Sequence, residues 1–332
     1  MNPADLPRTV AHAVRCAVED GELGAGSAAG RVVVERTRPG GVGDYASPVA
    51  FQIAKTARIR PAEVAAVLAH RLGRVPGIER VEVTGPGFVN FFLPPLSAPE
   101  VLDVLDARGG VPVPDGPAPA PAPQRPVPDG PAPAPAPQRE GVVRAAVLRI
   151  LRAQGHRPDG AGGDPGPVAP VAARDGDVVA RYGAGAAVWA MVAVPARETP
   201  VFSGRLLRQD ESSEYFRVRY AHARSRALLR NARDLGFGPE PGPVEDAQAL
   251  LRVLADHPLA LEAAAHHRAP ERLVRHLVEL ADALLDFQYR VLPQGDEKPS
   301  AAHRARLALA EAAGTVLAGG LALLGTDAPE RL

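Results

Sequence analysis

This 332-residue chain has little cysteine, little lysine and no net charge. Cys16 is the single cysteine, which excludes an internal disulfide and a cysteine-based zinc site and fits a reducing cytoplasm. Of the 38 basic residues only Lys55 and Lys298 are lysine, and 38 acidic residues balance them. The chain therefore has no overall positive charge of the kind that would indicate a nucleic-acid partner. We expect a cytoplasmic protein with no cofactor and no metal.

Long apolar runs are also missing. The N-terminus lacks the basic-then-apolar pattern of a signal peptide. The longest apolar stretch, Leu307 to Leu324, is interrupted by Glu311 and three glycines, and we take it as too short and too polar to span a bilayer. We expect no membrane partner.

Proline-rich low complexity divides the chain. Residues 112–125, PVPDGPAPAPAPQR, are repeated without change at 126–139. Alternate prolines remove amide donors and favour an extended, semi-rigid spacer. A second breaker-rich stretch runs from Pro158 to Pro170. We predict an N-terminal domain over 1–110, the spacer over 111–139, a middle segment over 140–205 and a C-terminal domain over 206–332.

Apolar periodicity predicts an α+β chain, with an α/β N-terminal domain and an all-α C-terminal bundle of four to six helices. In the first domain we expect helices over 4–18, 48–57 and 61–72 and strands over 31–36, 78–84 and 88–93. In the second we expect helices over 212–235, 243–256, 258–267, 270–292 and 300–324. Pro243, Pro258 and Pro270 stand where three of these would begin.

The segment from Tyr215 to Arg233 contains six arginines and no acid. One face of the predicted helix carries Arg219, Arg226, Arg230 and Arg233. Another face carries Phe216, Tyr220, Ala223 and Ala227. Guanidinium groups neutralise phosphates and aromatic faces stack splayed bases, so this pattern is typical of a surface that holds a single-stranded RNA loop. The alternative is a solvated helix whose arginines pair with acids on other helices.

Residues 215–224, YFRVRYAHAR, resemble the opening helix of the DALR anticodon-binding domain of arginyl-tRNA synthetases. The similarity continues through residues 304–309, RARLAL, and 316–325, VLAGGLALLG, to 329–332, PERL. This resemblance implies that Tyr220, Arg224, Arg230 and Leu332 lie by an anticodon loop. Leu332 replaces the family's usual methionine, Arg217 stands at an anticodon-loop position where the family often has an aromatic residue, and Gln288 replaces a frequent tyrosine. We take His222 as a helix-packing residue.

The first domain resembles the N-terminal domain of the same enzymes. Residues 43–46, GDYA, with 49–55, VAFQIAK, are similar to its first signature, and 81–93, VEVTGPGFVNFFL, are similar to its closing strands. In the family an aromatic residue and an asparagine two positions later read a base of the tRNA D-loop. The resemblance therefore implies that Phe88 stacks on a base and that Asn90 pairs with a base edge.

The catalytic motifs of these enzymes are absent from the chain. None of the nine histidines belongs to a His-x-Gly-His turn, and lysine at only two positions leaves no lysine-bearing catalytic loop. Residues 143–155 and 177–182 resemble fragments of the catalytic domain, or are an ordinary helix and strand that pack against the bundle. We expect no catalytic residues.

Three hypotheses follow from these patterns. The first is a non-catalytic tRNA-binding relative of arginyl-tRNA synthetase, with arginine tRNA as its partner. The second is a protein-interaction or regulatory module without RNA binding, whose partner would be a full-length synthetase or another protein. The third is an active arginine–tRNA ligase, which only the family resemblance supports.

Overall fold

The structure is a computed structural model that describes residues 1–24, 30–38, 40–107, 139–157 and 163–332. The chain divides into two compact units, Met1–Val101 and Leu102–Leu332. The spacer predicted over 111–139 lies outside the described residues except for Arg139, and so does the beginning of the predicted break at 158–170. The boundaries of the four predicted parts stay a prediction.

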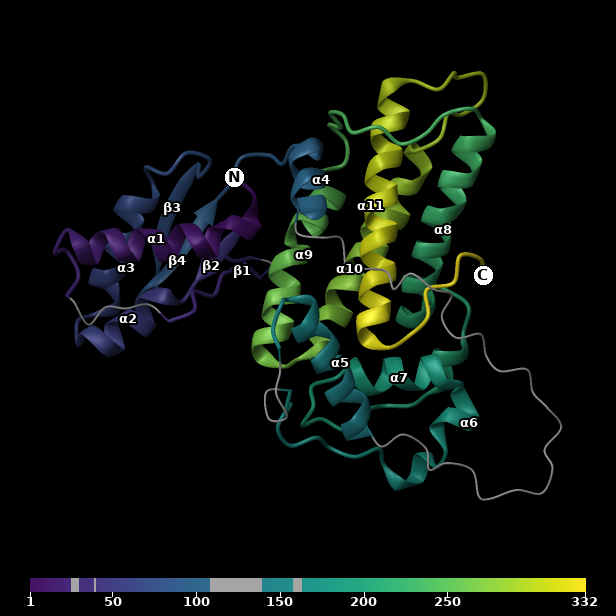
Figure 1. Cartoon of the computed structure of the whole chain (residues 1–332), viewed down its shortest axis with the longest axis horizontal. Coiled ribbons are helices and arrows are strands. Elements are labelled where there is room, and N and C mark those ends of the chain that lie inside the picture. Colours follow the sequence, from purple (N-terminus) through teal and green to yellow (C-terminus); the bar gives the residue numbers. More distant parts are fainter. Residues whose placement is uncertain (25–29, 39, 108–138, 158–162) are drawn as a thin grey trace. The chain divides into compact units, whose positions relative to one another are not determined.

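The first unit holds an antiparallel sheet with the strand order β1-β2-β4-β3 (Figure 1). The strands are β1 (Glu35–Arg36), β2 (Tyr45–Ser47), β3 (Arg80–Thr84) and β4 (Phe88–Phe92). The helices are α1 (Leu6–Glu19), α2 (Val49–Ala57) and α3 (Pro61–Leu72). Helices α2 and α3 both contact β4, where Val89 and Phe91 are fully buried. The central strand therefore joins the sheet to the helices through one apolar core.

The strand predicted over 31–36 is wrong for residues 31–34, because β1 contains only Glu35 and Arg36. Val32 and Val34 are buried, so the apolar pattern does mark a segment that packs into the core. The carbonyl of Val33, however, accepts a hydrogen bond from the Ser47 hydroxyl at 2.7 Å. A side chain thus takes the place of the backbone N–H that a neighbouring strand would supply. The short strand β2 was not predicted from the sequence.

The second unit is helical (Figure 1). Its long helices are α8 (Glu214–Asp234), α9 (Gln248–His267), α10 (Pro270–Phe287) and α11 (Ala301–Leu324). They are preceded by α5 (Arg139–Ala153), α6 (Val178–Tyr182) and α7 (Ala184–Val192), and α4 (Ala98–Ala107) spans the boundary between the units. Helix α8 packs on α10 and α11, and α10 packs on α9 and α11. The predicted helical bundle is confirmed, and residues 177–182 are helical rather than extended.

The prediction of separate helices over 243–256 and 258–267 is wrong, because α9 runs unbroken past Pro258. A proline inside a helix removes one backbone hydrogen bond and usually ends or kinks the helix. Leu254 and Leu261, on either side of the proline, are both buried, and α9 makes extensive contact with α10. Tertiary packing therefore holds together a helix that local sequence would divide.

Helix α11 matches the helix predicted over 300–324 to within one residue, but the expectation that its apolar stretch is too short and too polar to span a bilayer is wrong on length and composition. By length and composition alone its 24 residues, with a mean hydropathy of 1.8 in the most apolar window, could cross a membrane, but 72% of that window is buried within the protein. A Cβ at Gly314 would lie 2.2 Å from the Ser225 hydroxyl, and one at Gly320 would lie 2.5 Å from a Leu277 methyl. These glycines let α11 approach α8 and α10 closely.

Arg139 organises the segment that leads into the bundle. Arg139 is the first residue of α5 and is only 2% exposed. Its guanidinium donates hydrogen bonds to six backbone carbonyls, those of Ala169, Met191, Val194, Pro195, Ala196 and Glu198. Burial lowers the pKa of Arg139. The residue that ends the repeated spacer in the sequence is thus a buried anchor of the fold.

His257 makes the stability of the bundle sensitive to acid. Its ring stacks on His276 with centroids 5.1 Å apart, and neither of its nitrogens has a hydrogen-bond partner among the described residues. Burial lowers the pKa of His257 from 6.5 to about 4. The folded state therefore holds the ring neutral in a range where the unfolded chain takes up a proton.

We expect the wild-type chain to lose about 3 kcal/mol of unfolding free energy through His257 as the pH falls from about 6.5 to about 4. A His257→Leu variant lacks this titration and is expected to lose correspondingly less over the same range. Urea unfolding of both proteins at a series of pH values measures the difference. Parallel pH profiles for the two proteins would show that His257 does not carry the effect.

Candidate nucleic-acid interface

Phe88 lies at the start of β4, directly after the turn that joins it to β3. Thr84 and Phe88 are paired across this hairpin. The Phe88 side chain is 43% exposed, and its ring meets Phe51 of α2 edge-on with centroids 5.0 Å apart. One side of the ring is thus supported while part of it faces solvent, which suits an aromatic surface that stacks on a base.

Asn90 lies on the same strand but is buried, with 3% exposure. Its amide nitrogen donates to the hydroxyl of Thr84 at 2.8 Å and to the carbonyls of Glu82 at 3.2 Å and Phe88 at 3.4 Å. The amide is therefore occupied in tying the hairpin together. The geometry favours Asn90 as the residue that positions Phe88.

The two sequence signatures of the first unit meet at this hairpin. Tyr45 and Ala46 of β2 pair with Phe91 and Asn90 of β4. Gly43 has a φ of +78°, and a Cβ there would lie 2.9 Å from the Phe91 carbonyl oxygen. Glycine is therefore required at this position both by conformation and by space.

Helix α8 has two polar sides, and the side towards α10 contains three of the predicted contacts. Arg217 pairs with Asp282 at 3.1 Å, and Arg224 donates to the side-chain oxygen of Gln288. The ring of Tyr220 stacks on Phe216 with centroids 5.6 Å apart and is 39% exposed. Two stacked, partly exposed rings thus stand beside two arginines.

The other polar side of α8 carries the chain's final segment. Arg219 pairs with Asp327 at 3.0 Å and Arg226 with Glu330 at 3.2 Å. Nδ1 of His222 lies 3.0 Å from the Pro329 carbonyl oxygen, and because a carbonyl only accepts, the ring must donate. Burial lowers the pKa of His222, which favours the neutral form of this ring. His222 therefore holds the tail as well as packing in the helix.

The predicted anticodon-loop residues consequently fall into two groups. Arg217, Tyr220 and Arg224 lie together on the α10 side. Arg230 lies on the tail side, where its guanidinium reaches the Glu330 carbonyl at 3.5 Å. Leu332 follows that carbonyl by two residues and is 57% exposed. Phe88 and Asn90 belong to the other unit. The roles of these seven residues stay a prediction.

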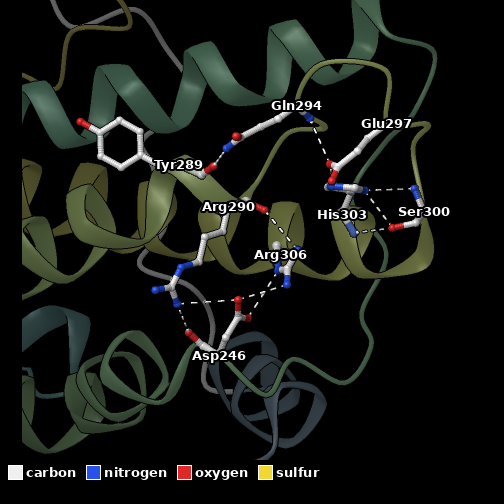
Figure 2. Close-up of polar contacts among 8 residues, drawn as sticks. All are labelled: Asp246, Tyr289, Arg290, Gln294, Glu297, Ser300, His303 and Arg306. Atoms are coloured by element: carbon white, nitrogen blue, oxygen red, sulfur yellow. Dashed lines mark hydrogen bonds and ion pairs between the residues drawn. The ribbon is translucent and has the colours of Figure 1, made fainter.

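Sequence reasoning missed Tyr289, which is 68% exposed. It lies in the short 3-10 helix Gln288–Arg290 that follows α10. Figure 2 shows its ring projecting away from the polar contacts that order the neighbouring loop, among them the bond from the Gln294 amide to the Tyr289 carbonyl at 2.6 Å. Its position beside Gln288, the partner of Arg224, places a further aromatic surface near the α10 side of α8.

Comparison with known proteins identifies both units. The arginyl-tRNA synthetase N-terminal domain family matches residues 8–93, and the DALR anticodon-binding domain family matches residues 218–332. Both matches confirm the predicted fold class, a mixed N-terminal domain followed by a helical anticodon-binding domain.

A solved structure shows a similar fold. Thermus thermophilus arginyl-tRNA synthetase superposes with a TM-score of 0.59 at 15% identity, in an alignment that covers 98% of this chain and 100% of that chain. A Campylobacter jejuni protein assigned provisionally as an arginyl-tRNA synthetase gives a TM-score of 0.40 at 21% identity, covering 47% of this chain and 35% of that one.

Between the two matched domains lie only residues 94–217. Part of that interval is the repeated proline-rich sequence, and part is α5 to α7. The chain therefore combines an arginyl-tRNA synthetase N-terminal domain with a DALR anticodon-binding domain, and it leaves no room for the catalytic domain of those enzymes.

Proposed function

We propose that this chain is a non-catalytic, cytoplasmic tRNA-binding protein whose partner is arginine tRNA. The observation that carries the proposal is the surface of α8, the helix on which the anticodon-binding match at 218–332 begins. There the stacked rings of Phe216 and Tyr220 stand beside Arg217 and Arg224. Aromatic faces accept unstacked bases and guanidinium groups neutralise the backbone. Phe88 would supply a second contact at the D-loop. Joining two modest sites in one chain raises the overall affinity.

Retention of tRNA from a total tRNA pool by the purified chain, followed by sequencing of the bound fraction, tests this proposal. Enrichment of arginine isoacceptors is expected. In the same preparation, arginine-dependent ATP–pyrophosphate exchange is expected to be absent. Exchange activity would support the third hypothesis, an arginine–tRNA ligase, and would sink the claim that the chain is non-catalytic.

A protein-interaction module is the second candidate, and the pairing of the α8 arginines favours it. Arg217, Arg219 and Arg226 each form an ion pair within the protein, as expected of a solvated helix. Such a protein would bind a full-length synthetase or another protein and would retain no tRNA even at low salt.

Phe88 and Asn90 are expected to respond differently to substitution by alanine. Phe88→Ala removes a partly exposed ring, so we expect weaker tRNA binding with stability changed by less than about 1 kcal/mol. Asn90→Ala removes the hydrogen bonds inside the hairpin, so we expect a loss of roughly 1–3 kcal/mol. Equilibrium unfolding and tRNA binding of both variants measure the two effects. Equal binding by wild type and Phe88→Ala would exclude Phe88 from the RNA contact.

A further inference from the structure

A basic groove lies beside the C-terminal half of α8. It encloses about 660 Å³ between that helix, residues 236–239, α11 and the final segment of the chain. Its charged lining consists of Arg226, Arg230, Arg233, Arg304, Glu311 and Glu330. Four cations against two anions leave an excess of positive charge. Of the four arginines, only Arg230 belongs to the predicted anticodon contacts.

The arginines of the basic groove are only partly neutralised by ion pairs and hydrogen bonds within the protein. Arg226 pairs with Glu330 at 3.2 Å and Arg304 with Glu240 at 3.1 Å. Among the described residues, the Arg230 guanidinium reaches only the Glu330 carbonyl, at 3.5 Å. Arg233 is exposed and makes no ion pair with any residue that the structure describes. The groove therefore has unused capacity for an anion.

Glu330 occupies the groove weakly. Its side chain is 64% exposed and that of Arg226 is 42% exposed, and an ion pair so open to water contributes about 0–1 kcal/mol. A ligand that offers several negative charges can therefore displace this carboxylate. Arg226 and Arg233 are separated by about 10 Å along the helix axis, a length over which one nucleic-acid strand presents more than one phosphate.

We propose that the basic groove binds the phosphate backbone of RNA, and that Glu330 occupies it as an exchangeable carboxylate when RNA is absent. This inference rests on the proposed tRNA binding and extends it. The Tyr220 side of α8 would stack bases, and the basic groove on the adjacent side would neutralise the strand that carries them. RNA is favoured over an acidic protein because stacked aromatic rings stand on the neighbouring side of the same helix.

Three variants of the full chain test the proposal with a synthetic arginine anticodon stem-loop RNA over a salt series. Arg233→Glu is expected to weaken binding on the order of tenfold and to reduce the salt slope by about 0.7. Glu330→Gln is expected to tighten binding on the order of threefold, because it removes the competing charge. Arg252→Glu, the same charge change at an exposed site on α9, is the matched control and is expected to leave both quantities unchanged.

The outcomes separate this inference from the proposed function. If wild type binds the RNA and Arg233→Glu behaves like Arg252→Glu, the groove is not the phosphate site although the proposed function stands. If Glu330→Gln weakens binding, the carboxylate positions the tail rather than competing with RNA, and the inference is overturned. Failure of both wild type and Glu330→Gln to bind at low salt overturns the inference and the proposed function together. Thermal unfolding of each variant confirms that it is folded.

Discussion

Reversing the charges of Arg224 and Arg230 together is expected to weaken tRNA binding by more than about 100-fold. The two side chains lie on different sides of α8, one bonded to Gln288 and the other beside Glu330. Each reversal removes a favourable phosphate contact and places a negative charge near the RNA, and in a highly charged ligand such changes multiply. Filter binding of total tRNA at fixed low salt measures the loss.

The matched control is the double variant Arg144→Glu/Arg252→Glu, which makes the same total charge change at exposed sites on α5 and α9. We expect less than about a threefold effect from the control, through the general field alone. Equal losses in both double variants would show that overall charge, rather than this helix, determines binding. A wild-type chain that retains no tRNA, while it and the Arg224/Arg230 double variant both bind a full-length synthetase, would favour the protein-interaction module.

Replacing Arg139 by methionine is expected to cost about 3–5 kcal/mol of unfolding free energy. The substitution keeps the length of the apolar stem but removes the guanidinium donors from six carbonyls. The carbonyls of Pro195 and Ala196 retain a backbone N–H donor, so the penalty falls mainly on the other four. Buried acceptors without donors carry a desolvation penalty that packing does not offset. Urea unfolding measures the loss.

Arg139→Lys serves as the control for charge. An ammonium group keeps the positive charge but has only three donors for six carbonyls, so we expect a smaller loss than for methionine. A loss below about 1 kcal/mol for Arg139→Met would mean that these carbonyls find water instead, and that the segment after α5 does not depend on this residue.

The sequence predicted the elements in which local pattern and packing agree. Helix α3 begins at Pro61 and ends at Leu72, as predicted. The β3–β4 hairpin follows from the alternation over 78–84, the apolar run over 88–93 and the turn residues between them. The predictions failed where tertiary contacts override a local signal. Pro258 lies inside α9, which has buried leucines on both sides of the proline and packs on α10. The Val33 carbonyl accepts a hydrogen bond from the Ser47 side chain instead of pairing in a strand.

The types of residue in the candidate site were predictable from the sequence, but the residues they pair with were not. The arginine stripe and the aromatic residues of α8 are visible in the sequence. That Asp327 and Glu330 would meet this stripe depends on the path of residues 325–332, which no local pattern encodes. The burial of Asn90 and Arg139 likewise depends on backbone segments distant in sequence. Periodicity identifies faces of helices and strands, whereas partners follow from the assembled fold.

The most direct test of the proposed function is equilibrium binding of the full chain to total tRNA across a salt series. If both matched domains contact RNA, the logarithm of the binding constant should fall linearly and steeply with the logarithm of salt concentration, because several phosphate contacts release counterions. No binding at low salt, or an affinity that does not change with salt, would contradict tRNA binding and leave a protein partner as the ligand to seek.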